Sequence, residues 1–237
     1  EGKRTLFIDG DSSVAAGNAF LERLGGRHGI TMEINALKLS ELDRDLMQSW
    51  IDRGKRLGSD YQLLDWRDDI PEEHFERFVE LIHVMNSAPT ENLDLEDFVL
   101  TPEQVRHYER ARKARGQRLW TRIARHRGSG ALAGYTELHW DPSNPPIFQQ
   151  ADTAVDPAHR GHGLGRWLKA ANLLSAMQDM PAATWVRTGN AGSNEAMLAI
   201  NRAMGFKLHK TITGWQFEIE ALAAALQARR AAAGAGA

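Results

Sequence analysis

Residues 155–165 read VDPAHRGHGLG, and this stretch decides the fold of the chain. Three glycines alternate with other residues, directly after a strand-like segment and directly before an apolar helical run that begins at Leu164. A helix begins with backbone N–H groups that have no partner inside the helix, and its dipole adds partial positive charge there. Glycines at this junction let phosphate oxygens approach those N–H groups without meeting a Cβ atom. The stretch predicts an anion-binding loop, and a plain tight turn is the alternative reading.

The composition limits the classes of function. The 237 residues are 42% hydrophobic and 25% charged, which is typical of a globular protein. The formal net charge of −2 predicts no nucleic-acid partner, and no apolar run is long enough to predict a membrane span. The absence of cysteine excludes disulfides and an acyl-cysteine intermediate. We expect a cytoplasmic protein without a secretory signal or a bound metal, and its oligomeric state stays open.

The pattern from residue 61 onward predicts one mixed α+β domain. We expect its strands at 61–66, 118–126, 131–140, 147–155, 184–188, 206–211 and 214–219. We expect its helices at 74–85, 101–115, 164–180 and 193–204, the second of them opened by a Thr-Pro pair.

The N-terminal segment repeats part of this pattern. A helix expected over 12–26 and a strand over 30–34 follow the same rhythm as 193–219, with Gly25 aligned on Gly205. Chance is the alternative, since helix–glycine–strand segments are common. We interpret residues 1–40 as the last helix and strand of a first, mostly missing copy of the domain.

The remaining boundaries follow from this interpretation. Residues 41–60 are expected to form a connecting amphipathic helix capped by Ser40. Residues 61–220 form the complete domain, and the Ala/Gly-rich tail at 221–237 is expected to begin as a helix and to end in disorder.

Two further features stand in register with the glycine loop. Arg160 opens the segment Arg-Gly-x-Gly-x-Gly, and Asn194 stands seven residues before Asn201, which is followed four residues later by Gly205-Phe206. This combination resembles the GNAT superfamily of N-acetyltransferases over about residues 61–220. The segment DTAVDPAHRGHGLGRWLKAANL looks like the tandem GNAT proteins of actinobacteria. Neither a P-loop nor a dinucleotide fingerprint fits this spacing.

The resemblance implies an α+β fold, whose mostly antiparallel central sheet splays between the family's fourth and fifth strands and carries flanking helices. It implies acetyl-CoA as co-substrate, with the pantetheine arm along the fourth strand and the pyrophosphate on the loop amides. The coenzyme A contacts that it implies are Ala154, Val155, Arg160, Gly161, His162, Gly163, Leu164, Gly165, Asn194 and Asn201.

The chemistry implied is acetyl transfer to a primary amine, directly within a ternary complex. The amine must lose a proton before it attacks, and a carboxylate can accept that proton. The family's usual glutamate position holds Gln149, so Glu137 and Asp152 are the candidates, and a bulge in the strand would decide whether 149 or 152 faces the cleft. The alternatives are that Glu137 faces solvent and that Asp152 makes a strand-end hydrogen bond. The N–H group of Val155 is the candidate for stabilising the developing oxyanion.

Two observations concern the substrate and the alternatives. Ten acidic residues against two arginines between residues 66 and 97 favour a small cationic amine, although a solvated helix face is the better explanation for at least half of these acids. The family's acid tyrosine is replaced by Asn201, which cannot donate a proton usefully. This departure and Gln149 keep two alternatives open: a catalytically idle coenzyme A-binding module and an interaction domain that binds no cofactor.

Overall fold

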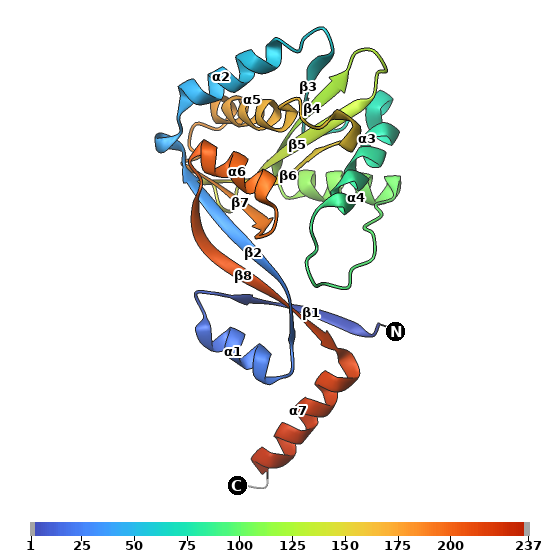
Figure 1. Ribbon diagram of the computed structural model, residues 1–237, viewed down its shortest axis with the longest axis vertical. Helices are drawn as coiled ribbons and strands as arrows, with labels where there is room; N and C mark the ends of the chain where they lie inside the picture. Colours follow the sequence, from blue (N-terminus) through green and yellow to red (C-terminus); the bar gives the residue numbers. More distant parts are fainter. Residues whose placement is uncertain (1–2, 235–237) are drawn as a thin grey trace.

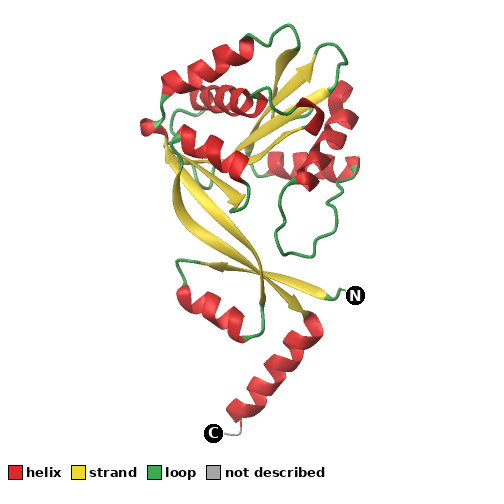
Figure 2. Cartoon of the chain, in the orientation of Figure 1, coloured by secondary structure: helices red, strands yellow, loops and turns green. Residues whose placement is uncertain are grey.

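The computed structural model describes residues 3–234, which form one eight-stranded sheet in the order β1-β8-β2-β7-β6-β5-β4-β3 (Figures 1 and 2). The strands are β1 (Thr5–Asp11), β2 (Arg27–Lys38), β3 (Tyr61–Arg67), β4 (Arg118–His126), β5 (Leu132–Trp140), β6 (Ile147–Val155), β7 (Trp185–Ala191) and β8 (Lys207–Glu218). The helices are α1 (Ala15–Arg23), α2 (Arg44–Lys55), α3 (Phe75–Ile82), α4 (Pro102–Ala114), α5 (Leu164–Asp179), α6 (Glu195–Met204) and α7 (Ile219–Gly234).

Strand pairing is antiparallel except between β6 and β7, which are parallel. Helices α2 and α5 pack on one face of the sheet, and α3 and α4 pack on the other (Figure 1). Side chains alternate between these faces, because Leu138 belongs to the core under α5 while Tyr135, three positions earlier, belongs to the core under α3. The α+β class with a mostly antiparallel, helix-flanked sheet is therefore confirmed.

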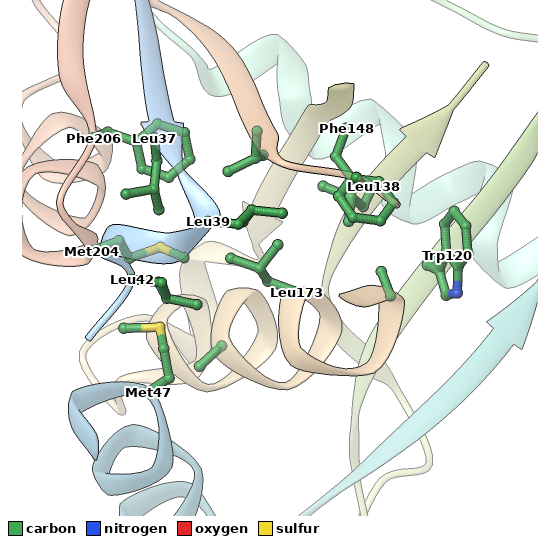
Figure 3. Packing of buried hydrophobic residues seen from close by; sticks show 14 of the residues in the cluster. Leu37, Leu39, Leu42, Met47, Trp120, Leu138, Phe148, Leu173, Met204 and Phe206 are labelled. Atoms are coloured by element: carbon green, nitrogen blue, oxygen red, sulfur yellow. The ribbon is translucent and has the colours of Figure 1, made fainter. Parts of the chain in front are cut away.

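The largest core lies between the sheet and α5 (Figure 3). Trp120, Leu138 and Phe148 project into it from the central strands and are fully buried. Leu37 from β2 and Phe206, just before β8, complete the same cluster. The N-terminal segment thus shares its core with the rest of the chain.

Residues 12–34 contain a helix and a strand, α1 and β2, as the pattern predicts. Adding 180 to each residue number of β1 and subtracting 180 from each residue number of β8 converts the β1–β8 pairing into the β2–β7 pairing. Asp11 pairs with Ile212 in β1–β8, and Met32 pairs with Ala191 in β2–β7. The two long strands β2 and β8 pair with each other between these flanking pairs (Figure 1). The segments 5–38 and 185–218 are therefore equivalent in strand register.

The structure corrects two expectations from the sequence and tests only part of a third. The connecting helix α2 is capped by Asp43, whose Oδ1 accepts from the Leu46 N–H at 2.8 Å, rather than by Ser40. The two strands expected at 206–211 and 214–219 are one strand, β8. The tail is helical through Gly234, and the disorder expected for the last residues concerns positions 235–237, which lie outside the described residues.

Candidate active site

The site begins where β6 and β7 separate. Their parallel pairing runs from Ile147 opposite Trp185 to Gln150 opposite Thr188 and then stops, although both strands continue. A cavity of about 750 Å³ opens beyond the last pair. It is lined by β6, β7, α6, the start of α5 and the segment 84–89 after α3. The splay expected between the family's fourth and fifth strands is present here.

The glycine loop forms one end of this cavity. Gly161 and Gly163 have φ angles of 84° and 78°, a left-handed conformation that glycine adopts without strain. A Cβ atom added to either residue would meet no atom within 4 Å, so the space above the loop is open. The first backbone bond of α5 is the one from Trp167 N–H to Gly163 O at 3.2 Å, and Gly163 offers no side-chain cap. Arg160 N–H donates to Pro157 O at 3.4 Å, whereas the amides of residues 161–166 have no backbone acceptor within the described part of the chain and are free to bind an anion.

Two side chains of the loop are engaged by the protein. Arg160 lines the cavity, donating from Nε to Val155 O at 3.0 Å and from Nη2 to Ser87 Oγ at 2.9 Å. Its guanidinium therefore joins the end of β6 to the segment after α3. His162 does not line the cavity; its ring lies 5.8 Å from that of Tyr61, and its Nδ1 lies 3.1 Å from His159 O. Only the backbone of His162 is placed to bind an anion. Leu164, although its side chain is buried, and Gly165 line the cavity at the first turn of α5.

The end of β6 turns backbone groups toward the cavity. Asp156 N–H donates to Ala133 O on β5 at 2.9 Å. Hydrogen-bonded and non-hydrogen-bonded pairs alternate along an antiparallel ladder, so the neighbouring pair Val155–Gly134 is non-bonded. The N–H group of Val155 therefore points away from β5, toward the splay. Ala154 and Val155 both line the cavity.

A bulge in β6 determines whether Gln149 or Asp152 reaches the site. Thr136 pairs with Thr153, whereas Leu138 pairs with Gln150. Between these two pairs β6 contains one residue more than β5, which defines the bulge. Gln150 anchors the bulge, because its amide donates to Glu137 O at 2.7 Å and to Thr136 Oγ1 at 3.1 Å. Asp152 consequently lines the cavity, while Gln149 is exposed and lies outside it.

Asp152 and Glu137 are two partly buried carboxyls on the α3 face of the sheet, and the charge of Asp152 acts on Glu137. Tyr135 Oη donates to Asp152 Oδ2 at 3.4 Å, and Thr121 Oγ1 donates to Glu137 Oε1 at 3.2 Å. The Glu137 side chain is only 18% exposed, and burial followed by the charge of Asp152 raises its pKa to about 7. Burial also raises the pKa of Asp152. Such a pair can hold and exchange a proton near neutral pH.

The two asparagines have different places. Asn194 lines the cavity and caps α6, its Oδ1 accepting from Met197 N–H at 3.2 Å. Asn201 is 1% exposed and does not line the cavity; its Nδ2 donates to Asn190 Oδ1 at 2.7 Å, and Asn190 lines the wall. Asn201 therefore supports the wall from behind, and direct contact with coenzyme A stays a prediction.

The acidic run between residues 66 and 97 does not form a wall of this cavity. None of its ten acids is among the lining residues; Asp68, Asp69 and Glu72 are paired with Arg118, Lys113 and Arg106. Three of the ten charges thus meet basic residues of α4 and β4, and the acidic acceptor wall stays a prediction. The segment that does line the cavity, 84–89, contributes only uncharged side chains.

Two lining residues were not identified from the sequence. Gln150 anchors the bulge, and Lys169 on α5 is buried. The sequence feature that could have indicated a buried Lys169 is its position inside the apolar run WLKAANLL. Within residues 3–234, no cluster of three or more His, Asp or Glu side chains could hold a metal ion. None of the described helices is both long and apolar enough to cross a membrane.

The comparisons with known proteins agree with this architecture. The profile of the Acetyltransferase (GNAT) family matches residues 78–206, more than half of the chain, and the chain belongs to this family. The GNAT resemblance seen in the sequence is thereby confirmed. No curated protein matches the chain.

Among solved structures, the chain is similar to a tandem GNAT protein from the clavulanic acid biosynthesis pathway, with 26% identity and a TM-score of 0.70. This match covers 91% of the present chain but 64% of that protein, so the chain spans less than two thirds of its length. A GCN5-related N-acetyltransferase from Sphaerobacter thermophilus shares the fold at 11% identity and a TM-score of 0.62, covering 92% of this chain and 62% of that one. The yncA protein of Salmonella typhimurium, solved with its cofactor acetyl-CoA, shares it at 15% identity and a TM-score of 0.50, covering 68% of this chain and 94% of that one.

Proposed function

We propose that this GNAT-family protein is an N-acetyltransferase that moves an acetyl group from acetyl-CoA to a primary amine on a small cationic molecule. The observation that carries the proposal is the cavity at the β6–β7 splay, which has free loop amides at one end and the partly buried carboxyls of Asp152 and Glu137 at or beside its wall. The Salmonella structure with acetyl-CoA supports the choice of co-substrate.

The residues fit a coenzyme A thioester. The open space above Gly161 and Gly163 and the free amides at the start of α5 suit a pyrophosphate. The end of β6, at Ala154 and Val155, offers backbone groups to the pantetheine amides. When bound, acetyl-CoA supplies an activated acyl group, and the chain has to position the amine against it.

The protein's own groups would carry the proton and the developing charge. Asp152, at the cavity wall, takes the proton from the ammonium of the acceptor, with Glu137 as the second member of the pair. The N–H group of Val155 stabilises the negative charge that develops on the carbonyl oxygen. The carboxylate pair also favours a cationic acceptor over a neutral or acidic one, a role that the sequence assigned to the distant acidic run.

An idle coenzyme A-binding module is the second candidate, favoured by Asn201 in place of the family's acid tyrosine. Calorimetric titration with acetyl-CoA, followed by a thiol-release assay over a panel of primary amines, separates the two. Binding together with amine-dependent thiol release supports the acetyltransferase. Binding without release from any amine would support the idle module, and the absence of binding would contradict both.

We also propose that residues 1–40 are the end of a first GNAT-like repeat, joined by residues 41–60 to the domain at 61–220. The support is the constant offset of 180 between the two sets of strand pairs, together with the likeness to a tandem GNAT protein. Superposition of residues 5–38 on 185–218 tests this directly, and different helix placement in the two segments would contradict it.

A further inference from the structure

Lys169 is a buried lysine that faces the proposed acetyl-transfer cavity. It lies on α5, is 1% exposed and lines the cavity where β6 and β7 part. Gln150 and Thr188, the last pair before the splay, line the same region. A flexible ammonium side chain is rarely buried without a function or a paired charge.

No counter-charge explains this burial. Within residues 3–234 the Lys169 ammonium has neither a hydrogen-bond acceptor nor an ion-pair partner, and its Nζ lies 5.8 Å from the centre of the Phe206 ring. The other charged or titratable residues that line the cavity are Asp152, His159, Arg160 and Arg166. Of these, Asp152 is bonded to Tyr135 and Arg160 to Ser87 and Val155. Burial lowers the pKa of Lys169 to about 7, so its nitrogen exchanges a proton readily near neutral pH.

None of the three tyrosines is free to act as a proton donor in the cavity. Tyr61 Oη is bonded to His159 Nδ1 at 2.9 Å, and Tyr135 Oη is bonded to Asp152. Tyr108 is exposed on α4, outside the cavity. Asn201, at the position of the family's acid, donates to Asn190 instead.

We propose that Lys169 is the proton donor to the sulfur of coenzyme A as it leaves, a role that rests on the proposed acetyltransferase function. The acceptor nitrogen forms a bond to the carbonyl carbon, and the carbon–sulfur bond breaks with its electron pair on sulfur. The Lys169 ammonium gives one proton to that sulfur and becomes a neutral amine. The carboxylate pair takes the first proton from the acceptor ammonium before the attack, and the nitrogen releases its second proton to solvent as the amide forms. Exchange with solvent then returns the carboxylate pair to its ionised form and Lys169 to its ammonium form.

The first test needs no turnover. Coenzyme A is bound to the wild-type protein and to Lys169→Met, and the thiolate absorbance is titrated with pH. An ammonium beside the sulfur should lower the pKa of the bound thiol by about one unit or more in the wild type relative to Lys169→Met. Lys207→Met, which removes an exposed lysine on β8, is the matched control and should titrate as the wild type does. Equal thiol pKa values in wild type and Lys169→Met would overturn the proposal.

The second test uses turnover and stability. The alkaline fall of kcat in the wild type should disappear in Lys169→Met, with turnover reduced about 10-fold or more near pH 7. Lys169→Arg should not restore it, because a guanidinium does not release its proton. Lys169→Met should unfold at a higher temperature than the wild type at pH 7, since it removes a buried cation, which separates loss of function from loss of folding.

Two outcomes separate this proposal from the function on which it rests. If the wild-type protein fails to bind coenzyme A, the proposed function itself is overturned. If acetyl-CoA acetylates Lys169, shown by mass spectrometry of the peptide that contains it, then Lys169 is an acceptor and its role as proton donor is overturned while acetyl-CoA use stands.

Discussion

Replacing Glu137 by Gln should change activity and stability in opposite directions. Burial and the charge of Asp152 raise the pKa of Glu137 from 4.5 to about 7. One pKa unit corresponds to about 1.4 kcal/mol, so an ionised Glu137 costs the folded state about 3 kcal/mol. Glutamine has nearly the same shape and can still accept from Thr121 Oγ1, but it carries no charge.

This cost appears in a defined pH window. The folded state holds the Glu137 proton more tightly than the unfolded state. The contribution of Glu137 to the free energy of unfolding is therefore highest below pH 4.5 and falls as the pH rises to about 7. Glu137→Gln lacks this dependence. It should match the wild type near pH 4.5 and exceed it by about 3 kcal/mol above pH 7, or by about 6–12 °C in Tm for a chain of this size.

Thermal denaturation followed by circular dichroism between about pH 4.5 and 8.5 measures this difference. Glu96→Gln, on the exposed segment before α4, is the matched control and should give a difference that does not change with pH. The thiol-release assay should show turnover of Glu137→Gln reduced by about 100-fold near pH 7. A stability difference that stays constant with pH would refute the burial argument, and full turnover would leave Asp152 as the sole base.

Three further changes address the rest of the site. Asp152→Asn should lower turnover about 100-fold or more with acetyl-CoA affinity kept, and unchanged thiol release would remove Asp152 from the proton path. Gly163→Val should weaken acetyl-CoA binding about tenfold or more in calorimetry, whereas Gly116→Val, at an equally left-handed position outside the cavity, should not; equal effects would show backbone strain alone. Asn201→Ala should weaken acetyl-CoA several-fold by freeing Asn190, with turnover at saturation unchanged; loss of turnover at full affinity would reverse the roles assigned here.

Local features of the site were predictable because they depend on neighbours in the sequence. Gly161 and Gly163 adopt left-handed backbone conformations at a helix start, and the alternating glycines of the sequence indicate a turn there. The choice between Gln149 and Asp152 could only be left open. It depends on the bulge, and the bulge is held by bonds from Gln150 to β5 that no local pattern reveals.

Features that depend on pairing between distant strands were harder to predict from the sequence. The sequence predicts two short strands separated at residues 212–213, yet β8 is continuous through Gly214. A Cβ atom at Gly214 would lie 2.8 Å from Ile30 Cγ2, so glycine is needed there because β2 packs closely against β8. Lys169 was missed for a similar reason: its burial follows from how α5 packs on the sheet and places Lys169 near Phe206, not from its neighbours in the chain.

The pairing of β8 determines where this protein can be divided for expression. By sequence, the acetyltransferase domain ends at about residue 220 and begins at about residue 61. Within the described residues, however, the strand partners of β8 are β1 and β2, and both precede residue 40. β7 likewise pairs with β2 on the side opposite β6. A clone that starts at residue 41 would leave β8 without a partner strand and expose the edge of β7, which invites aggregation. The smallest unit that keeps β7 paired on both sides and gives β8 a partner strand therefore includes β2.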